Sequence, residues 1–217
     1  MAVATAHKGK TALHAICTGQ EGHSALAPNY VNALYLASDL VEIIRTEQAA
    51  LQANFVQDAD YDIPYTTLHV GKIHGGDTLN IIADRCDVHF EIRSLAIDNP
   101  TEILARIKIK IAELVHEARK ISAAADITLE ITNSYPGRDT PADSEAVRFV
   151  KSLTGANGTI KVAYGTEGGL FSQRLGIQAV VCGPGSMAQG HRTDEFVTAD
   201  QLGSCIQMLD NLLIRLA

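Results

Sequence analysis

The stretch Asp84–Leu95 reads Asp-Arg-Cys-Asp-Val-His-Phe-Glu-Ile-Arg-Ser-Leu. From Val88 to Ile92 apolar side chains alternate with polar ones, which is the period of a strand with one buried face. A second strand-like run, Tyr65–Ile73, lies before it, and Gly75-Gly76-Asp77-Thr78 separates the two. These features predict an antiparallel hairpin or a close relative of one.

On each side of this hairpin the pattern predicts one strand and one helix. Upstream, Thr11–Thr18 alternates like a strand, and Asn29–Ala50 has helical spacing with Asn29 as a plausible N-cap. Downstream, an amphipathic helix from about Thr101 to Ser122 precedes the strand-like run Ile127–Thr132. The order β-α-β-β-α-β is that of the ferredoxin-like split βαβ unit.

The periodicity stops between Ser134 and Pro141, where two prolines and a glycine indicate a linker or domain edge. Helices and strands then alternate, as expected for a parallel or mixed sheet that forms the tail of a larger α/β domain. One of these runs, Ile177–Cys182, predicts a strand buried on both faces. The other expected elements are helix Asp143–Leu153, strand Thr159–Ala163, a helix from the Gly165–Gly169 segment to Arg174, and helix Thr198–Leu216.

Composition excludes several classes of partner. The 217 residues carry a net charge of −7 and no basic run, so a nucleic acid partner is not expected. No apolar stretch approaches the ~20 residues that span a bilayer, so no membrane association is expected either. The first residues lack a signal-peptide core, and the four cysteines are widely spaced. We therefore expect a cytoplasmic protein with reduced thiols.

A glycine-rich loop near the C-terminus carries a lone imidazole. Gly183-Pro184-Gly185-Ser186 follows the strand-like run at 177–182, and His191 lies a few residues further on. Ligands collect beyond the carboxyl ends of strands in open α/β sheets. On the local sequence alone His191 is more plausibly an ordinary loop histidine, because a metal centre needs three or four ligands and no H-E-x-x-H or C-x-x-C motif lies nearby.

Several short motifs occur in an order and spacing that are specific in combination. They are His7-Lys8-Gly9, Gly22-His23-Ser24-Ala25 with Pro28, Gly75-Gly76-Asp77-Thr78-Leu79-Asn80, Glu91-Ile92-Arg93, Gly165-Thr166-Glu167-Gly168-Gly169, and Gly183-Pro184-Gly185-Ser186 with His191. Through these motifs nearly the whole chain resembles the metallopeptidase family of zinc-dependent aminoacylase, carboxypeptidase G and succinyl-diaminopimelate desuccinylase. Within that family it is most similar to members that hydrolyse N-acetylornithine in arginine biosynthesis.

The resemblance implies an α+β fold in two parts. Residues 10–132 correspond to a ferredoxin-like lid, which also forms the homodimer interface in that family. Residues 1–9 and 133–217 correspond to the C-terminal portion of a catalytic α/β domain of the zinc-exopeptidase kind.

The resemblance also implies a reaction, the hydrolysis of an N-acyl amino acid to a free amine and a carboxylate. Two divalent metals, zinc or cobalt, bind and activate the water. His191 matches the last metal ligand. In the family the other ligands and the glutamate general base lie upstream of the His-Lys-Gly motif, and no H-x-D or Glu-Glu precedes His7 here. We therefore expect this chain alone to bind no metal stably and to be inactive.

Two residues of the lid match groups that act on the substrate. His23 matches a histidine that reaches the partner subunit's active site and stabilises the oxyanion, with a histidine that fixes a helix entry near Pro28 as the alternative. Asn80 matches an asparagine that hydrogen-bonds the substrate. The alternative for Asn80 is a turn-capping residue after the paired glycines.

The remaining candidates bind the substrate's charged groups. Arg93 is suited to a substrate carboxylate or to a structural ion pair. Gly183, Gly185 and Ser186 match a site for the α-carboxylate, with a plain strand-to-loop turn as the alternative. Glu167 is expected to pair with the distal ammonium of N-acetylornithine, or else to be an acid favoured at a helix N-terminus.

A rival interpretation is a non-enzymatic module. In it, a ferredoxin-like domain with an exposed edge strand mediates dimerisation or binds a small molecule.

Overall fold

The computed structural model describes residues 1–54, 56–190 and 192–217. These residues form two compact units. The one called here the central unit contains Gly9–Ala59 and Ile63–Tyr135. The other, the terminal unit, contains Met1–Lys8, Asp60–Asp62 and Pro136–Ala217.

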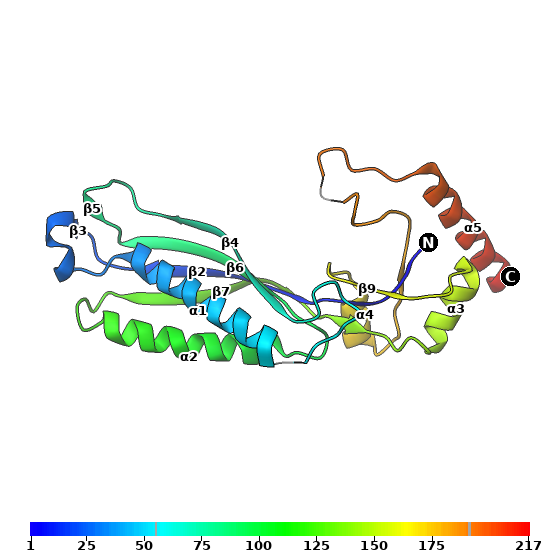
Figure 1. Cartoon of the computed structure of the whole chain (residues 1–217), viewed down its shortest axis with the longest axis horizontal. Coiled ribbons are helices and arrows are strands. Elements are labelled where there is room, and N and C mark those ends of the chain that lie inside the picture. The colour runs from blue at the N-terminus through cyan, green and yellow to red at the C-terminus, as the bar shows by residue number, and fades with distance from the viewer. Residues whose placement is uncertain (55, 191) are drawn as a thin grey trace. The chain divides into compact units, whose positions relative to one another are not determined.

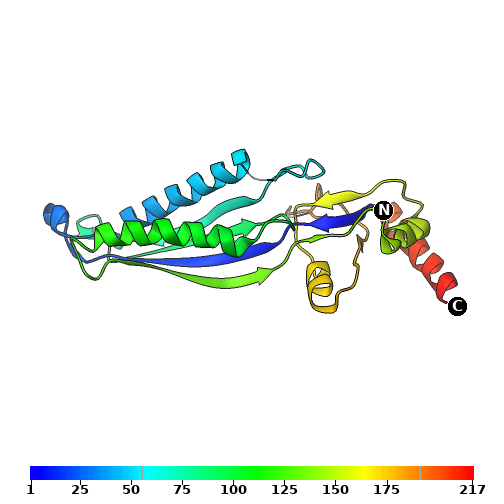
Figure 2. The same cartoon turned by 90° about the horizontal axis from the view of Figure 1, so that it is seen from below.

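The central unit is built on a four-stranded antiparallel sheet in the order β4-β6-β2-β7. Its elements follow one another as β2 (Lys10–Thr18), α1 (Ala33–Asn54), β4 (Thr67–Gly75), β6 (Arg85–Arg93), α2 (Pro100–Ala118) and β7 (Asp126–Tyr135). Both helices lie on one face of the sheet (Figures 1 and 2). This is the ferredoxin-like arrangement, and the expected α+β fold class is confirmed.

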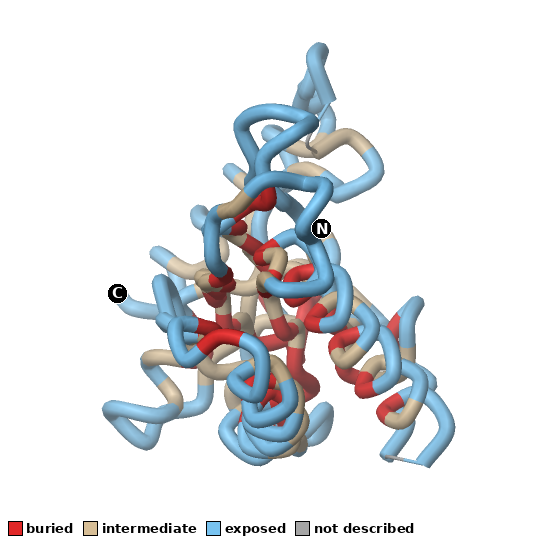
Figure 3. The backbone as a smooth tube through the Cα atoms, turned by 90° about the vertical axis from the view of Figure 1, so that its left-hand side faces the viewer, coloured by how far each residue is buried: buried red, intermediate tan, exposed pale blue. Residues whose placement is uncertain are grey.

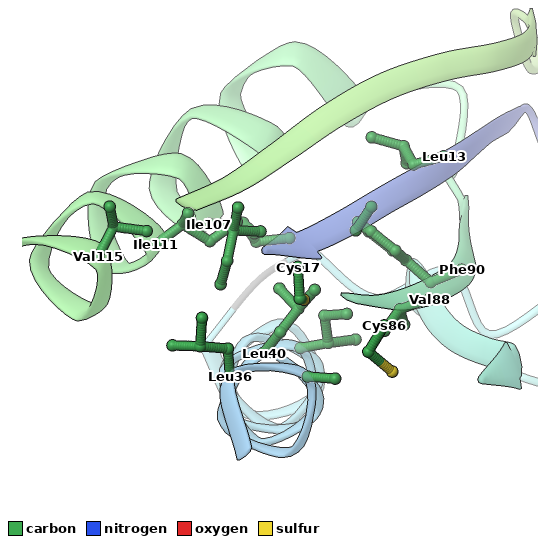
Figure 4. Packing of buried hydrophobic residues seen from close by; sticks show 14 of the residues in the cluster. Leu13, Cys17, Leu36, Leu40, Cys86, Val88, Phe90, Ile107, Ile111 and Val115 are labelled. Carbon is green, nitrogen blue, oxygen red and sulfur yellow. The ribbon is translucent and has the colours of Figure 1, made fainter. Parts of the chain in front are cut away.

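The alternation in the sequence places every second strand residue under the helices. In β2, Leu13, Ala15 and Cys17 are buried while the residues between them are partly exposed. Leu40 of α1 and Ile107 of α2 belong to the same hydrophobic cluster as these strand residues, and both are fully buried. Figure 4 labels Leu13, Cys17, Leu40 and Ile107 within this cluster. Each such aliphatic side chain stabilises the fold by about 1.5–3 kcal/mol. Figure 3 shows the buried residues on the inner sides of the helices and the exposed residues outside.

Two cysteines belong to this core. Cys17 of β2 and Cys86 of β6 are paired in register, and both are fully buried. Burial, aided by the nearby Cys86 and Asp87, raises the pKa of the Cys17 thiol to about 12. The four cysteines are all free thiols, as the sequence predicts.

The start of α1 differs from the sequence prediction. Asn29 is not the N-cap of a long helix, because it is the last residue of a separate 3-10 helix, η1 (Ser24–Asn29). The next residue, Tyr30, is extended, with φ −132° and ψ 158°, so the helical geometry is interrupted there. Asn32 satisfies the first turn of α1 instead, since its side-chain oxygen accepts a hydrogen bond of 2.9 Å from the Leu34 N–H.

The terminal unit contains a mixed four-stranded sheet around β1 (Val3–His7). β9 (Ile160–Val162) runs parallel to β1, whereas β8 (Arg138–Asp139) and β10 (Val181–Cys182) are antiparallel to it. All five residues of β1 are buried. A mixed sheet is one of the two alternatives that the sequence left open, but the sequence does not identify β1 as a strand.

The strand predicted over Ile177–Cys182 is largely wrong. Only Val181 and Cys182 pair, with Ala4 and Val3 of β1. Ile177 is half exposed. Among the described residues β10 has no second strand partner, so the expected burial on both faces is not achieved.

Among its described residues the terminal unit also has three helices, α3 (Glu145–Thr154), α4 (Gly168–Leu175) and α5 (Ala199–Leu216). Thr198 caps α5 through a capping box with Gln201. None of the residues of α5 is buried, and the large apolar side chains left exposed on it are Leu202, Ile206, Leu209, Leu213, Ile214 and Leu216. Over the described parts of the chain, no helix combines the length and apolar character needed to span a membrane.

Candidate functional site

A small two-stranded ribbon carries the candidate catalytic histidine. In it β3 (Gly22–His23) pairs antiparallel with β5 (Ile81–Ile82), and His23 lies opposite Ile81. The Ser24 N–H donates a 3.0 Å hydrogen bond to the Asn80 carbonyl oxygen. His23 and Asn80, which are far apart in the sequence, are therefore neighbours in the central unit, at the end where Figure 1 labels β3 and β5.

The imidazole of His23 has a defined hydrogen-bonding role. Its Nδ1 accepts a 3.1 Å hydrogen bond from the Ala25 N–H, so the residue is the N-cap of η1. A neutral imidazole whose Nδ1 is an acceptor carries its proton on Nε2. Because the His23 side chain is exposed, this Nε2–H is a donor that faces solvent or a bound molecule.

Asn80 lies next to this segment through its backbone, because its carbonyl oxygen accepts from the Ser24 N–H. The residue is exposed, and its neighbour Leu79 is completely exposed. This backbone hydrogen bond with Ser24 is consistent with the alternative role of Asn80 as a turn residue. The structure thus brings together the backbones of the two residues of the central unit that are predicted to act on the substrate.

Arg93 lies at the opposite end of β6, roughly 27 Å along the strand at ~3.4 Å per residue. Its Nε and Nη2 donate to the two carboxylate oxygens of Glu91 at 2.8 and 3.2 Å, and Nη1 donates to the Tyr135 hydroxyl at 3.3 Å. Burial works against ionisation of Glu91, but Arg93 and Lys10 outweigh it and lower the pKa of this carboxyl. Arg93 is therefore engaged in the ion pair that the sequence offered as its alternative role.

In the terminal unit a buried histidine fixes the segment that carries Glu167. The Nε2 of His7 accepts a 3.1 Å hydrogen bond from the Gly169 N–H, and its Nδ1 lies 3.0 Å from the Lys8 carbonyl oxygen. Burial, with a contribution from Arg138, lowers the pKa of His7, although the Lys8 carbonyl and Glu167 oppose this shift. Glu167 itself is exposed before the first turn of α4 and makes no side-chain capping bond.

The sequence predicts no role for His7 beyond its place in a motif. The available signal was the run Val-Ala-Thr-Ala-His, which is short and only weakly β-forming. A Cβ atom at Gly169 would lie 2.3 Å from the Pro136 carbonyl oxygen and 3.2 Å from His7 Cε1. Glycine is therefore required where α4 meets β1.

Gly183, Gly185 and Ser186 follow β10 and line one hollow of the terminal unit, together with Lys161 and Asp139. Its volume is about 1160 Å³, above the ~300–1,000 Å³ of typical ligand pockets. Gly185 has φ +99°, which favours glycine. The Ser186 hydroxyl accepts a 3.3 Å hydrogen bond from the Ala188 N–H, and the Lys161 ammonium pairs with Asp139 at 3.0 Å.

The predicted metal ligand, His191, lies outside the described residues. Within residues 1–190 and 192–217, Phe55 excepted, no group of three or more His, Cys, Asp or Glu side chains is arranged to hold a metal ion. The described residues therefore do not by themselves form a metal centre.

Comparison with known families agrees with the fold of the central unit. The family model described as a peptidase dimerisation domain matches residues 5–122. The chain belongs to this peptidase dimerisation domain family. The family resemblance inferred from the motifs is confirmed.

Among curated proteins the chain is similar to acetylornithine deacetylases. It is 32% identical over 212 residues to that of Aliivibrio fischeri strain MJ11, covering 96% of this chain and 53% of the relative. It is 29% identical over 209 residues to that of Pasteurella multocida strain Pm70, covering 96% of this chain and 52% of the relative. The chain thus spans about half the length of the curated relatives it matches.

Solved structures share the fold at lower identity. A tripeptidase from Staphylococcus aureus has a TM-score of 0.68 at 20% identity, covering 97% of this chain and 52% of that chain. The aminopeptidase PepT from Bacillus cereus has a TM-score of 0.67 at 20% identity, with the same coverage of both chains.

Proposed function

We propose that the chain is part of an amide hydrolase that deacylates N-acyl amino acids, with N-acetylornithine as the substrate and arginine biosynthesis as the setting. The family membership and the names of the curated relatives support this proposal. The observation that carries it is the imidazole of His23, which has its Nδ1 held by the backbone and its Nε2–H free to donate.

In this proposal His23 stabilises the oxyanion that forms when the amide carbonyl is attacked. The developing negative charge on the acyl oxygen accepts a hydrogen bond from the Nε2–H. A donor already fixed in place contributes more than one that must be ordered during the reaction, about 3 kcal/mol for a single donor in a dry site. Asn80, beside it on the ribbon, is the partner that orients the substrate amide.

We further propose that the central unit forms a homodimer and that His23 acts in the partner subunit's site. The description of the family as a dimerisation domain supports the dimer. The strands at the two edges of the sheet, β4 and β7, offer unpaired backbone groups of the kind that pair between copies. The assignment of residues 10–132 as a lid stays a prediction.

The terminal unit binds the charged groups of the substrate in this proposal. Gly183, Gly185 and Ser186 provide backbone and hydroxyl donors for the α-carboxylate, and Glu167 pairs with the distal ammonium. The exposure of Glu167 and its freedom from a capping bond support that role. Arg93 is a weaker candidate for the carboxylate, because Glu91 already takes up two of its donors.

Metal binding stays a prediction that rests on His191 and on the resemblance. The described residues do not form a metal centre, and the roles proposed above belong to the side chains and backbone of this chain itself. We propose that these 217 residues alone neither hold zinc or cobalt stably nor hydrolyse the substrate. A cytoplasmic location likewise stays a prediction from the sequence.

The test compares the whole gene product with two histidine variants in an N-acetylornithine hydrolysis assay supplied with zinc or cobalt. His23→Ala is expected to lower kcat by about 10²–10³-fold, the effect of losing one oxyanion donor. His116→Ala, which removes an exposed histidine of α2, is the matched control and retains full activity. Full activity in His23→Ala would contradict the proposed role of this residue.

Substrate choice is tested separately with Glu167→Gln. This variant is expected to lose its preference for N-acetylornithine over N-acetyl amino acids with uncharged side chains. An unchanged preference would contradict the pairing with the ammonium group. A stable dimer that has no metal affinity and no hydrolase activity as the whole gene product would favour the non-enzymatic module instead.

A further inference from the structure

The loop that carries His23 is closed at its base and folded back on itself. At the base, the Gln20 N–H donates a 2.8 Å hydrogen bond to the Val31 carbonyl oxygen. Inside the loop, His23 caps the start of η1, and the Tyr30 N–H closes its end by donating to the Ala27 carbonyl oxygen at 3.1 Å. His23 and Tyr30 are thus the residues that flank η1 at its two ends.

The ring of Tyr30 packs against the backbone immediately before His23. A Cβ atom at Gly22 would lie 2.7 Å from both Cε1 and Cζ of this ring, which is closer than carbon atoms approach one another. Only glycine therefore leaves room for the ring at this position. The side chain of Tyr30 is half-buried although most of the loop around it is exposed.

We propose that Tyr30 is a positioning residue that fixes the direction of the His23 imidazole. The proposal rests on the proposed function of His23. Two restraints then act on this histidine, the Ala25 N–H on its Nδ1 and the aromatic ring against the preceding Gly22. Together they hold the Nε2–H in one orientation before substrate binds, so that no ordering cost is added in the transition state.

The contact is made by ring carbons, so the hydroxyl of Tyr30 is not required for it. Tyr30→Phe should therefore preserve the positioning, whereas Tyr30→Ala should abolish it. Tyr35→Ala is the matched control, because Tyr35 is a tyrosine of α1 that is 70% exposed.

The first measurement is the ¹⁵N NMR spectrum of the His23 imidazole in the full chain, in mildly alkaline buffer where imidazoles are neutral. In the native chain and in Tyr30→Phe, the shifts are expected to report one tautomer with the proton on Nε2. In Tyr30→Ala they should move toward the averaged values of a free imidazole, and the Ala25 amide should lose about tenfold of its protection from exchange. Unchanged His23 shifts and Ala25 protection in Tyr30→Ala would overturn the proposal.

A double-mutant cycle guards against a simple folding defect. Gly22→Ala introduces the clashing methyl group and should displace the ring, with the same spectral change as Tyr30→Ala. In a Tyr30→Ala background the methyl group meets no ring, so Gly22→Ala should add no further change to the His23 shifts. Additive effects of the two substitutions would show that Gly22 and Tyr30 act separately, which contradicts the proposal.

Kinetics of the whole gene product separate positioning from substrate binding. Tyr30→Ala should lower kcat about tenfold with little change in KM, and Tyr30→Phe should match the native enzyme. A rise in KM at unchanged kcat would contradict a positioning role. If the NMR changes occur and His23→Ala retains full activity, the proposed oxyanion role is wrong while the structural link from Tyr30 to His23 stands.

Discussion

Removal of Arg106 is expected to destabilise the central unit more than removal of the charge on its partner, Glu47. The two side chains join α2 to α1, with the Glu47 carboxylate oxygen 2.8 Å from the Nε and 2.6 Å from the Nη2 of Arg106. Their environments differ, since the side chain of Glu47 is 4% exposed and that of Arg106 is 36% exposed. The cost of breaking the pair therefore depends on which member stays behind.

Arg106→Met leaves a buried carboxylate without its guanidinium, and stranding one member of a buried pair costs about 3 kcal/mol or more. Glu47→Gln leaves a guanidinium on a side chain that is 36% exposed, and this group can still donate to the amide oxygen of the glutamine, so the cost is about 1 kcal/mol. The difference of about 2 kcal/mol corresponds to several degrees in Tm. The double variant Glu47→Leu/Arg106→Met buries no charge and should recover most of the loss.

Urea unfolding followed by far-ultraviolet circular dichroism gives the total effect. Amide exchange of α1 and α2 assigns that effect to the central unit, where both helices lie. Equal losses of stability for Arg106→Met and Glu47→Gln, or a larger loss for Glu47→Gln, would refute the reasoning from burial.

Three further outcomes are expected. Leu40→Ala, at a fully buried site of α1, should cost about 2–5 kcal/mol, and a loss below 1 kcal/mol in urea unfolding would speak against a close-packed core. Thr198→Ala should destabilise α5 by about 1 kcal/mol through loss of its cap, seen as faster amide exchange in the first turn of that helix but not in α2. Because burial lowers the pKa of His7 below its usual value of 6.5, the unfolded chain binds a proton more readily, and the stability of the terminal unit should fall as the pH drops below about 6.5. His7→Gln should flatten this slope in thermal unfolding measured from pH 7.5 to 5.5, and an unchanged slope would assign the dependence to another group.

The central unit was predictable because its periodicity is long and regular. In both β2 and β6 the burial alternates over nine residues, and the two strands pair along nearly their whole length. Such patterns report burial directly, because one face of each strand lies under the helices.

The terminal unit was less predictable because its strands are short and their partners are distant. β1 owes its burial to residues near positions 138, 160 and 181, none of which is visible from the local sequence Val-Ala-Thr-Ala-His. Conversely, the apolar run Ile177–Cys182 resembles a buried strand but finds a partner for only two residues. A local sequence pattern indicates that a segment can form a strand, but the strand forms only where neighbouring segments pair with it.

The site shows the same limit. Neither β3 nor β5 is longer than two residues, so no periodicity predicts the pairing that places His23 beside Asn80. Only the resemblance linked these two residues to a shared role. For Arg93 the sequence left two roles open. Only the structure shows that its guanidinium donates hydrogen bonds to Glu91 and Tyr135. His191 lies outside the described residues, so its role stays a prediction.

Because Cys17 and Cys86 are buried, the rate at which an alkylating reagent labels them measures local opening of the central unit. Thiols react with alkylating reagents as thiolates that the reagent can reach, and these two are sealed in the core of the central unit. Cys182 and Cys205 belong to the terminal unit and are only partly buried. Timed alkylation followed by peptide mass analysis would therefore assign each labelled thiol to the unit that opened. The order of labelling would show whether the central or the terminal unit opens first.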